Sequence, residues 1–229
     1  MTAMNLKWLA LLEVAKLSCI PTRDEIQQAL IARHGEEMQN KFSAATVAVC
    51  GLGGLGSNIA VSLARAGVGK LILIDFDMVD ISNLNRQQYK ADQIGLYKTE
   101  ALNANLHEIM PYIETELHTV KLTEDNFYDI LKNADVICEA FDGAEQKAML
   151  VNGVLEKLNN KYLIAASGMA GLGSANNITT RRIIKNFYLC GDGISDVADG
   201  LGLVSARVML CAAHQATMIL RVLSGITEP

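Results

Sequence analysis

Apolar and polar residues follow two different periodicities in the first half of this chain. Residues 46–50 (TVAVC) and 70–75 (KLILID) are short apolar runs, typical of buried strands. Residues 59–67 instead repeat apolar positions at helical spacing and end in glycine. A glycine turn over residues 51–58 joins the first strand to this helix, so the pattern predicts a β-α-β unit of about 30 residues.

The same alternation continues to residue 167. It predicts helices over residues 99–110, 126–133 and 148–160, and strands over residues 114–122, 135–141 and 162–167. Repeated strand and helix segments with short connections form a mostly parallel sheet with helices on both faces. The expected fold class is therefore α/β and Rossmann-like.

Two short helices are predicted before the first strand. The second begins at a capping box formed by Thr22 and Glu25, and Gly35 ends it. Arg33 falls seven residues after Ile26, on the same apolar face. A cation on such a face must extend to solvent or meet a partner charge.

The regular alternation fades after residue 167. Residues 169–193 predict a hairpin-like excursion with two β-rich arms, and residues 203–223 predict a long helix. Polar residues inside that helix, among them Arg207 and His214, would be costly in lipid, so a buried helix is expected rather than a membrane span. His214 is expected to be a hydrogen-bonded core residue.

Composition limits the domain count and the partners. With 229 residues, 50% of them apolar, the chain suits one sizeable domain, and we expect a helical arm over 1–45 followed by a single domain over 46–229. The apolar surplus favours a second subunit. A formal net charge of −5 argues against nonspecific binding of nucleic acid.

The five cysteines are scattered and form no CxxC pair. That spacing argues against a disulfide framework and against a four-thiolate zinc site, and it indicates a reducing compartment such as the cytoplasm. Near the N-terminus, Glu13 and Lys16 interrupt the apolar run, which argues against a signal peptide.

Gly51, Gly53 and Gly56 form a GxGxxG frame between a strand and a helix. Glycine is needed there because the turn is tight and the backbone must approach a phosphate closely. Asp75, at the end of the next strand, is placed to accept hydrogen bonds from a ribose. The alternative is a glycine turn with a capping aspartate, and taken alone the motif would indicate NAD.

Cations and a further carboxylate change that interpretation. Arg86, in the string SNLNRQ, and Lys98 are suited to the charge of a triphosphate, although an isolated pair of this kind is more often solvated surface. Asp142 follows a strand at the carboxyl edge, where a carboxylate holds Mg²⁺ against phosphates or caps the helix starting near Ala144. The residues alone leave both roles open.

Together the segments GLGGLGSN, LARAGVGKLILIDFD and SNLNRQ, with Lys98 and Asp142, resemble the ubiquitin-activating superfamily. RHG, GLGLVSARV and AAHQA make the chain look most like its short thiamine-pathway members, the ThiF-type sulfur-carrier adenylyltransferases. The resemblance covers roughly residues 20–225 and is far more specific than a lone GxGxxG.

The resemblance implies ATP-dependent adenylation of the C-terminal Gly-Gly carboxylate of a small sulfur-carrier protein, with Mg²⁺ held by Asp142. The catalytic residues that it implies are Arg86, Lys98, Asp142 and Arg33, the last reaching the phosphates from the opposite protomer of a homodimer. The nucleotide-binding residues that it implies are Gly51, Gly53, Gly54, Gly56, Asp75, Asp77, Asn83, Asn85, Arg86, Gln87 and Lys98.

The chain also departs from longer family members. Their two zinc-binding CxxC pairs are missing, since Phe187 precedes Cys190 at that spacing, so no zinc is expected. The loop before the last helix has no cysteine, and Cys190 is interpreted as a structural thiol. Alternative functions are adenylation of a small molecule, a peptide or threonylcarbamoyladenosine in tRNA, or NAD binding. Against the tRNA alternative, the only basic cluster is Arg181, Arg182 and Lys185.

Overall fold

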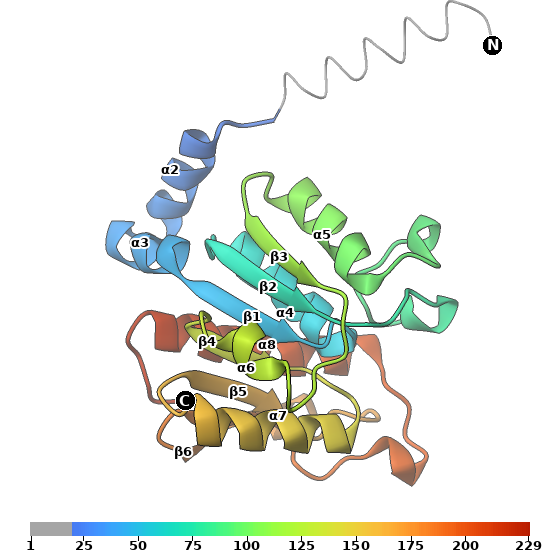
Figure 1. Ribbon diagram of the computed structural model, residues 1–229. Helices are drawn as coiled ribbons and strands as arrows, with labels where there is room; N and C mark the ends of the chain where they lie inside the picture. The colour runs from blue at the N-terminus through green and yellow to red at the C-terminus, as the bar shows by residue number, and fades with distance from the viewer. Residues whose placement is uncertain (1–19) are drawn as a thin grey trace, which may run out of the picture.

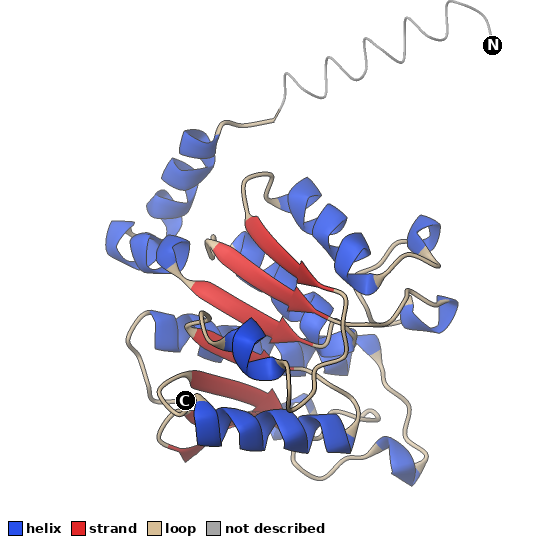
Figure 2. Ribbon diagram, in the orientation of Figure 1, coloured by secondary structure: helices blue, strands red, loops and turns tan. Residues whose placement is uncertain are grey.

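The computed structural model describes residues 20–229, which form a seven-stranded sheet (Figure 1, Figure 2). Its strands are β1 (Thr46–Cys50), β2 (Lys70–Ile74), β3 (Glu114–His118), β4 (Val136–Glu139), β5 (Tyr162–Ala166), β6 (Thr179–Ile184) and β7 (Phe187–Gly191). The strand order is β3-β2-β1-β4-β5-β7-β6, and only β6 and β7 pair antiparallel. The prediction of a Rossmann-like, mostly parallel sheet is confirmed.

Helices cover both faces of the sheet, as predicted (Figure 1). The helices of one face are α4 (Gly54–Arg65), α5 (Lys98–Ile109) and α8 (Ser205–Leu223), and those of the other are α6 (Phe127–Leu131) and α7 (Ala144–Lys157). Successive residues of β1 alternate between the two cores: Val49 belongs to the first and Cys50 to the second. Because both faces are buried, β1 and β2 are apolar after their first residue.

Three strand predictions need correction. The strand expected over 114–122 ends at His118, because its partner β2 ends at the paired residue Ile74. The strand expected over 135–141 ends at Glu139, so Asp142 lies in the loop beyond it. The hairpin of β6 and β7 is not an excursion: β7 pairs parallel with β5 and extends the sheet.

The helical region before β1 contains α2 (Arg23–His34) and α3 (Glu36–Ala44). The predicted capping box is confirmed, since the Thr22 hydroxyl accepts from the Glu25 amide at 3.2 Å and the Glu25 carboxylate accepts from the Thr22 amide at 2.8 Å. Gly35 ends α2 with φ +82°, and α3, which the sequence analysis missed, begins directly after it. The first predicted helix and Cys19 lie outside the described residues.

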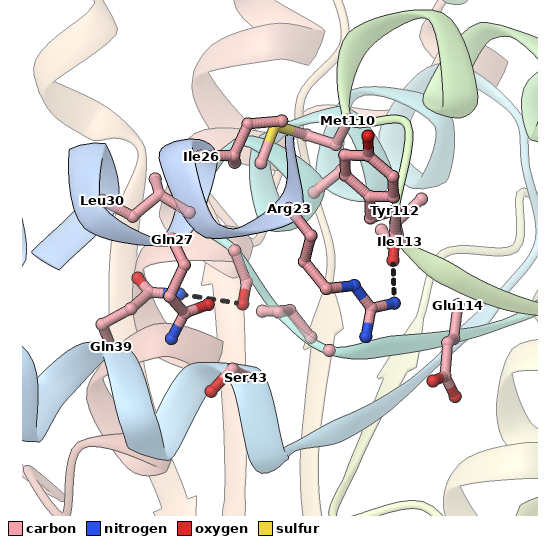
Figure 3. Close-up of a pocket in the computed structure, with 14 residues that line it drawn as sticks. Arg23, Ile26, Gln27, Leu30, Gln39, Ser43, Met110, Tyr112, Ile113 and Glu114 are labelled. Atoms are coloured by element: carbon pink, nitrogen blue, oxygen red, sulfur yellow. Dashed lines mark hydrogen bonds between the residues drawn. The ribbon is translucent and has the colours of Figure 1, made fainter. Parts of the chain in front are cut away.

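A cavity of about 150 Å³ separates α2 from the amino ends of β2 and β3 (Figure 3). Arg23 bridges it, donating from Nη2 to the Tyr112 carbonyl at 3.2 Å. Since α2 buries none of its residues fully, its apolar face is only half-covered and Arg33 in its last turn is exposed. Within one chain Arg33 therefore extends to solvent, one of the two outcomes expected for a cation on that face, and its role at a partner subunit stays a prediction.

The long helix α8 lies against the sheet and α4, with Val208, Cys211, Ile219 and other residues buried. His214 is half-buried, and its Nδ1 lies 3.0 Å from the Thr180 hydroxyl, which confirms a hydrogen-bonded core histidine. Among residues 20–229, no helix combines the length and the apolar character needed to cross a bilayer.

Candidate functional site

A cleft of about 690 Å³ opens where β1, β2, β4 and β5 end. In an open α/β sheet this edge is where ligands bind. The predicted site residues that line the cleft are Gly51, Gly53, Gly54, Asp75, Asp77, Arg86, Gln87, Lys98 and Asp142. Residues far apart in the chain therefore meet around one space.

Close backbone contacts explain the glycines between β1 and α4. Gly51 has φ +92°, and a Cβ there would lie 2.8 Å from the Ala140 carbonyl oxygen. A Cβ on Gly56 would lie 1.8 Å from the Gly51 carbonyl oxygen, so Gly56 closes the turn instead of lining the cleft. Gly53 is the N-cap of α4 and has no side chain to cover the free amides of the first turn, which favour an anion.

Asp75 braces this turn from the end of β2. It is 8% exposed, and its carboxylate accepts from the Leu52 amide at 2.7 Å and from the Asp77 amide at 2.8 Å. Burial raises the pKa of Asp75, an effect that Lys98 opposes. Tyr89 holds the same turn by donating its hydroxyl to the Leu52 carbonyl at 2.7 Å.

Two cations reach the cleft next to this turn. Lys98, in the first turn of α5, is largely buried, and its Nζ lies 2.7 Å from an Asp77 carboxylate oxygen. Arg86 donates from Nη1 to the Asn85 side-chain oxygen at 2.8 Å and to the Ser82 carbonyl at 3.2 Å. Because both of these Arg86 hydrogen bonds use Nη1, the other guanidinium donors remain available to an anionic ligand.

Gln87 lies buried between Arg86 and the glycine turn, with 8% of its surface exposed. Its side-chain oxygen has no hydrogen-bond partner among residues 20–229. A buried amide oxygen without a donor is costly, and in a cleft it is suited to a hydrogen-bond donor on a ligand.

Asn83, Asn85 and Arg33 are not brought into the cleft. Asn83 closes the short turn Ile81–Asn83, where its side-chain oxygen accepts from the Asp80 amide at 3.0 Å. Asn85 is exposed, orients Arg86 and donates to the Leu203 carbonyl at 3.3 Å. Arg33 belongs to α2, which lies at the amino ends of the strands (Figure 1), whereas the cleft lies at their carboxyl ends.

Asp142 lies exposed at the rim of the cleft. It does not cap α7, because Gly143 is the N-cap and no side chain bonds there. One carboxylate suits Mg²⁺ that keeps water and phosphate oxygens as its other ligands. Among residues 20–229, no three His, Cys, Asp or Glu side chains gather into a preformed metal site.

An ion pair beside the cleft was not predicted from the sequence. Glu139, at the end of β4, is fully buried, and its carboxylate oxygens accept from Lys147 Nζ at 2.6 and 2.8 Å. Lys147 also donates to the Ala166 carbonyl at 3.0 Å, which ties β4 to β5. Burial raises the pKa of Glu139 and Lys147 opposes this shift. The sequence signal for this pair was Glu139, an acidic residue inside the apolar run VICEAF.

The described cysteines are buried and lie outside the cleft lining. Burial raises the pKa of Cys190 to about 11 and that of Cys211 to about 12, and it also raises those of Cys50 and Cys138. A buried thiol with a raised pKa is a poor nucleophile at neutral pH, which supports a structural role for Cys190.

Known proteins are similar to this chain in sequence and in fold. The chain is 28% identical over 212 residues to adenylyltransferase and sulfurtransferase MOCS3 of Aedes aegypti, covering 87% of this chain and 46% of that protein. It is 41% identical over 105 residues to ubiquitin-like modifier-activating enzyme 5 of Caenorhabditis briggsae, covering 46% of this chain and 23% of that protein. The chain thus spans less than half the length of these relatives.

Among solved structures, the E. coli tRNA N6-threonylcarbamoyladenosine dehydratase TcdA, in complex with ATP, superposes with a TM-score of 0.80 at 21% identity. That match covers 90% of this chain and 97% of the other. E. coli MccB with ATP superposes with a TM-score of 0.65 at 22% identity, covering 84% and 60%. These matches show a shared fold. The sequence model of the ThiF family matches residues 26–229, nearly all of the described chain. The chain belongs to the ThiF family.

Proposed function

We propose that this protein is an ATP-dependent adenylyltransferase that activates the C-terminal Gly-Gly carboxylate of a small sulfur-carrier protein of the thiamine-biosynthesis type. The observation that carries the proposal is one cleft that combines the open amides of α4 with Arg86 and Lys98. Such a site suits a triphosphate better than the pyrophosphate of NAD. Relatives named as adenylyltransferases and ubiquitin-like modifier-activating enzymes support it.

In the proposed reaction, a carboxylate oxygen of the carrier attacks the α-phosphorus of ATP. A bond forms between that oxygen and phosphorus, the bond to the bridging oxygen breaks, and pyrophosphate leaves with its electron pair. No general base is required, because the carboxylate is already ionised at neutral pH. The amides of α4 bind the phosphates, Asp75 and Gln87 orient the nucleoside, and Arg86 and Lys98 stabilise the charge that develops on the leaving group.

Mg²⁺ would be held by Asp142 together with phosphate oxygens and water, and when bound it would neutralise phosphate charge. The exposed position of Asp142 at the rim suits an ion that enters with the nucleotide. Asp142→Asn is expected to raise the Mg²⁺ concentration required for exchange of pyrophosphate into ATP. Binding of Mg-ATP by calorimetry gives a readout that does not depend on turnover.

The decisive test is exchange of labelled pyrophosphate into ATP, measured with and without a Gly-Gly-terminated carrier encoded near this protein. We expect exchange that depends on the carrier and falls at least about a hundredfold in Lys98→Met. Lys132→Met is the matched control, since Lys132 pairs with Asp129 on the exposed surface of α6. If no such carrier supports exchange of pyrophosphate into ATP, the proposal is wrong.

We further propose that the protein acts as a homodimer in the cytoplasm and that Arg33 serves the cleft of the partner subunit. Within one chain Arg33 is exposed and belongs to α2, whereas the cleft lies at the carboxyl ends of the strands. Arg33→Ala should therefore reduce exchange. Mixing equal amounts of Arg33→Ala and Lys98→Met protomers should restore about a quarter of the wild-type rate, because about half of the dimers are then mixed and each mixed dimer has one complete site of two. No recovery on mixing would exclude action across the dimer.

TcdA makes threonylcarbamoyladenosine in tRNA the second candidate substrate. Within the basic cluster, the Arg182 guanidinium donates to the Lys185 carbonyl, and its Nη1 lies 3.5 Å from a Glu228 carboxylate oxygen. A formal net charge of −5 also weighs against nucleic acid. Pyrophosphate exchange that depends on tRNA instead of a carrier protein would favour this candidate, whereas binding of NAD in preference to Mg-ATP would favour a redox module.

A further inference from the structure

Arg207 occupies an unusual position in the first turn of α8. It is only 6% exposed, although a cation near a helix N-terminus is disfavoured by the helix dipole. Its guanidinium donates from Nε to the Ala170 carbonyl at 3.2 Å, and from Nη1 to the carbonyls of Gly173 at 2.6 Å and Ser174 at 3.0 Å. Nη2 donates to an Asp192 carboxylate oxygen at 2.6 Å. One side chain therefore joins two loops to α8.

Asp192 completes the connection from the second loop. Its other carboxylate oxygen accepts from the amides of Ile194 and Ser195, both at 2.9 Å. Although burial opposes ionisation, these amides and Arg207 lower the pKa of Asp192 to about 2. The Ser195 hydroxyl in turn accepts from the Ala170 amide at 3.0 Å, so the two loops also contact each other directly.

The two loops leave no space for other side chains at their contact. A Cβ on Gly168 would lie 2.0 Å from an Asp192 carboxylate oxygen, and a Cβ on Gly173 would lie 3.2 Å from Arg207 Nη2. The backbone also pairs there, because the Asp192 amide donates to the Gly168 carbonyl at 2.9 Å. The loops therefore form one rigid wall.

This wall lines the cleft beyond the end of β5, whereas the glycine turn lines it beyond the end of β1. Its residues in the cleft lining are Gly168, Met169, Ala170, Ser195, Asp196 and Val197. Arg207 itself does not belong to the lining. The loops also carry Leu172 and Ile194, each 82% exposed, so the same wall presents apolar side chains to the exterior beside the cleft.

We propose that Arg207, acting through Asp192 and the two loops, is a positioning residue that shapes the carrier-protein side of the cleft independently of the nucleotide side. The inference rests on the proposed function, because it assigns the loop wall to the carrier tail. Residues that approach ATP in that proposal come from other segments, between Gly51 and Asp142. Loosening the wall therefore changes recognition of the carrier and leaves recognition of ATP intact.

The test uses the full chain and compares Arg207→Met with Arg221→Met. Arg221 lies in the last turn of the same helix, and its guanidinium donates to the Glu228 carbonyl, its one side-chain partner among residues 20–229, so it is the matched control. For Arg207→Met we expect KM for the carrier to rise at least about tenfold while KM for ATP stays within about twofold. Arg207→Lys keeps the charge but loses the planar fork, so its KM for the carrier should be intermediate.

Hydrogen exchange gives a readout independent of turnover. In Arg207→Met the amides of residues 167–174 and 192–197 should exchange faster, while those of residues 51–58 remain as in the wild type. The inference would be overturned by equal increases in KM for ATP and for the carrier, or by amide hydrogen exchange that stays unchanged in both loops. If the wild-type protein shows no exchange of pyrophosphate with any carrier, the proposed function fails, and loop protection still decides whether Arg207 orders the wall.

Discussion

The two sides of the cleft are built in different ways. The nucleotide side consists of a glycine turn, a helix start and the ends of β1 and β2, supported by Asp75 and Tyr89 from neighbouring segments. The wall beyond β5 consists of two irregular loops that depend on the buried pair of Arg207 and Asp192. Regular backbone therefore positions one side, whereas the loops of the other side are joined through Arg207 and Asp192 and through hydrogen bonds between the loops themselves.

This difference separates stability from specificity. The sheet and α4 hold the glycine turn through the core, so its geometry persists as long as the domain is folded. The loop wall is joined by hydrogen bonds around Arg207 and Asp192, so a substitution of either residue acts on the loops directly. Substitutions on the two sides should consequently produce different signatures.

Gly56→Ala is the largest expected effect and acts on the nucleotide side. Its Cβ would lie 1.8 Å from the Gly51 carbonyl oxygen and 3.1 Å from a Val49 methyl group, so β1 and α4 must move apart. We expect a loss of roughly 4 kcal/mol or more in the free energy of unfolding, measured in urea, and loss of pyrophosphate exchange. Gly202→Ala is the control, since no atom of residues 20–229 beyond its chain neighbours lies within 4 Å of a Cβ placed there. Equal stability of the two variants would contradict this account of the turn.

Lys147→Met acts at the junction of the two sides and comes second. It leaves the buried Glu139 carboxylate without its counter-ion and should cost about 3 kcal/mol of unfolding free energy at pH 7. Burial already raises the pKa of Glu139, so in the variant the folded state takes up a proton more readily than the unfolded state. The deficit should therefore shrink as the pH falls from 7 to 5.

The double variant Glu139→Gln, Lys147→Met is the control for that prediction. Removing both charges eliminates the unpaired carboxylate, so part of the stability should return and the pH dependence should disappear. A single variant whose deficit is independent of pH would show that lost packing, and not the buried charge, is the cause.

Asp192→Asn acts on the loop wall, and its effect should be smaller and dependent on pH. The folded pKa of Asp192, about 2, lies below the usual range for Asp, so the stabilisation is complete above that range and is lost as the pH falls toward 2. We expect the wild type to exceed the variant by about 2 kcal/mol in unfolding free energy at pH 7, with the difference decreasing between pH 4 and 2. A difference that stays constant over this interval would refute the ion-pair explanation.

The same contrast explains which features could be predicted from the sequence. The strands and the glycine turn follow from local patterns, because both faces of the sheet are buried and Gly51 and Gly56 meet within one short segment. The loop wall has no such pattern: Arg207 bonds Ala170 and Gly173, more than 30 residues away in the chain. The sequence marked Arg207 only as a cation that would be costly in lipid, and no local pattern indicated its partners.

Two further differences have physical reasons. The helix α3 was missed because it buries only Gln39 and Phe42, too few residues for a helical apolar pattern. Asn83 and Asn85 belong to the same string as Arg86, but the side chain of Asn83 bonds the Asp80 amide and that of Asn85 bonds the Leu203 carbonyl and Arg86, so neither residue lines the cleft. Membership of a motif therefore predicted the neighbourhood of the site better than the direction of each side chain.

Gln87→Leu gives the smallest expected effect and the sharpest test of the nucleotide side. The Gln87 side-chain oxygen is buried without a partner among the described residues, so a leucine of similar volume should leave the unfolding free energy unchanged or slightly higher. If that oxygen accepts from bound ATP, the same variant should weaken ATP binding about tenfold, or ~1.4 kcal/mol. Calorimetric titration with Mg-ATP and urea unfolding measure the two quantities on one sample. A variant that keeps its unfolding free energy but binds ATP more weakly would show that Gln87 is retained for ligand binding. A loss of both stability and ATP affinity would mean that Gln87 supports the folded turn itself.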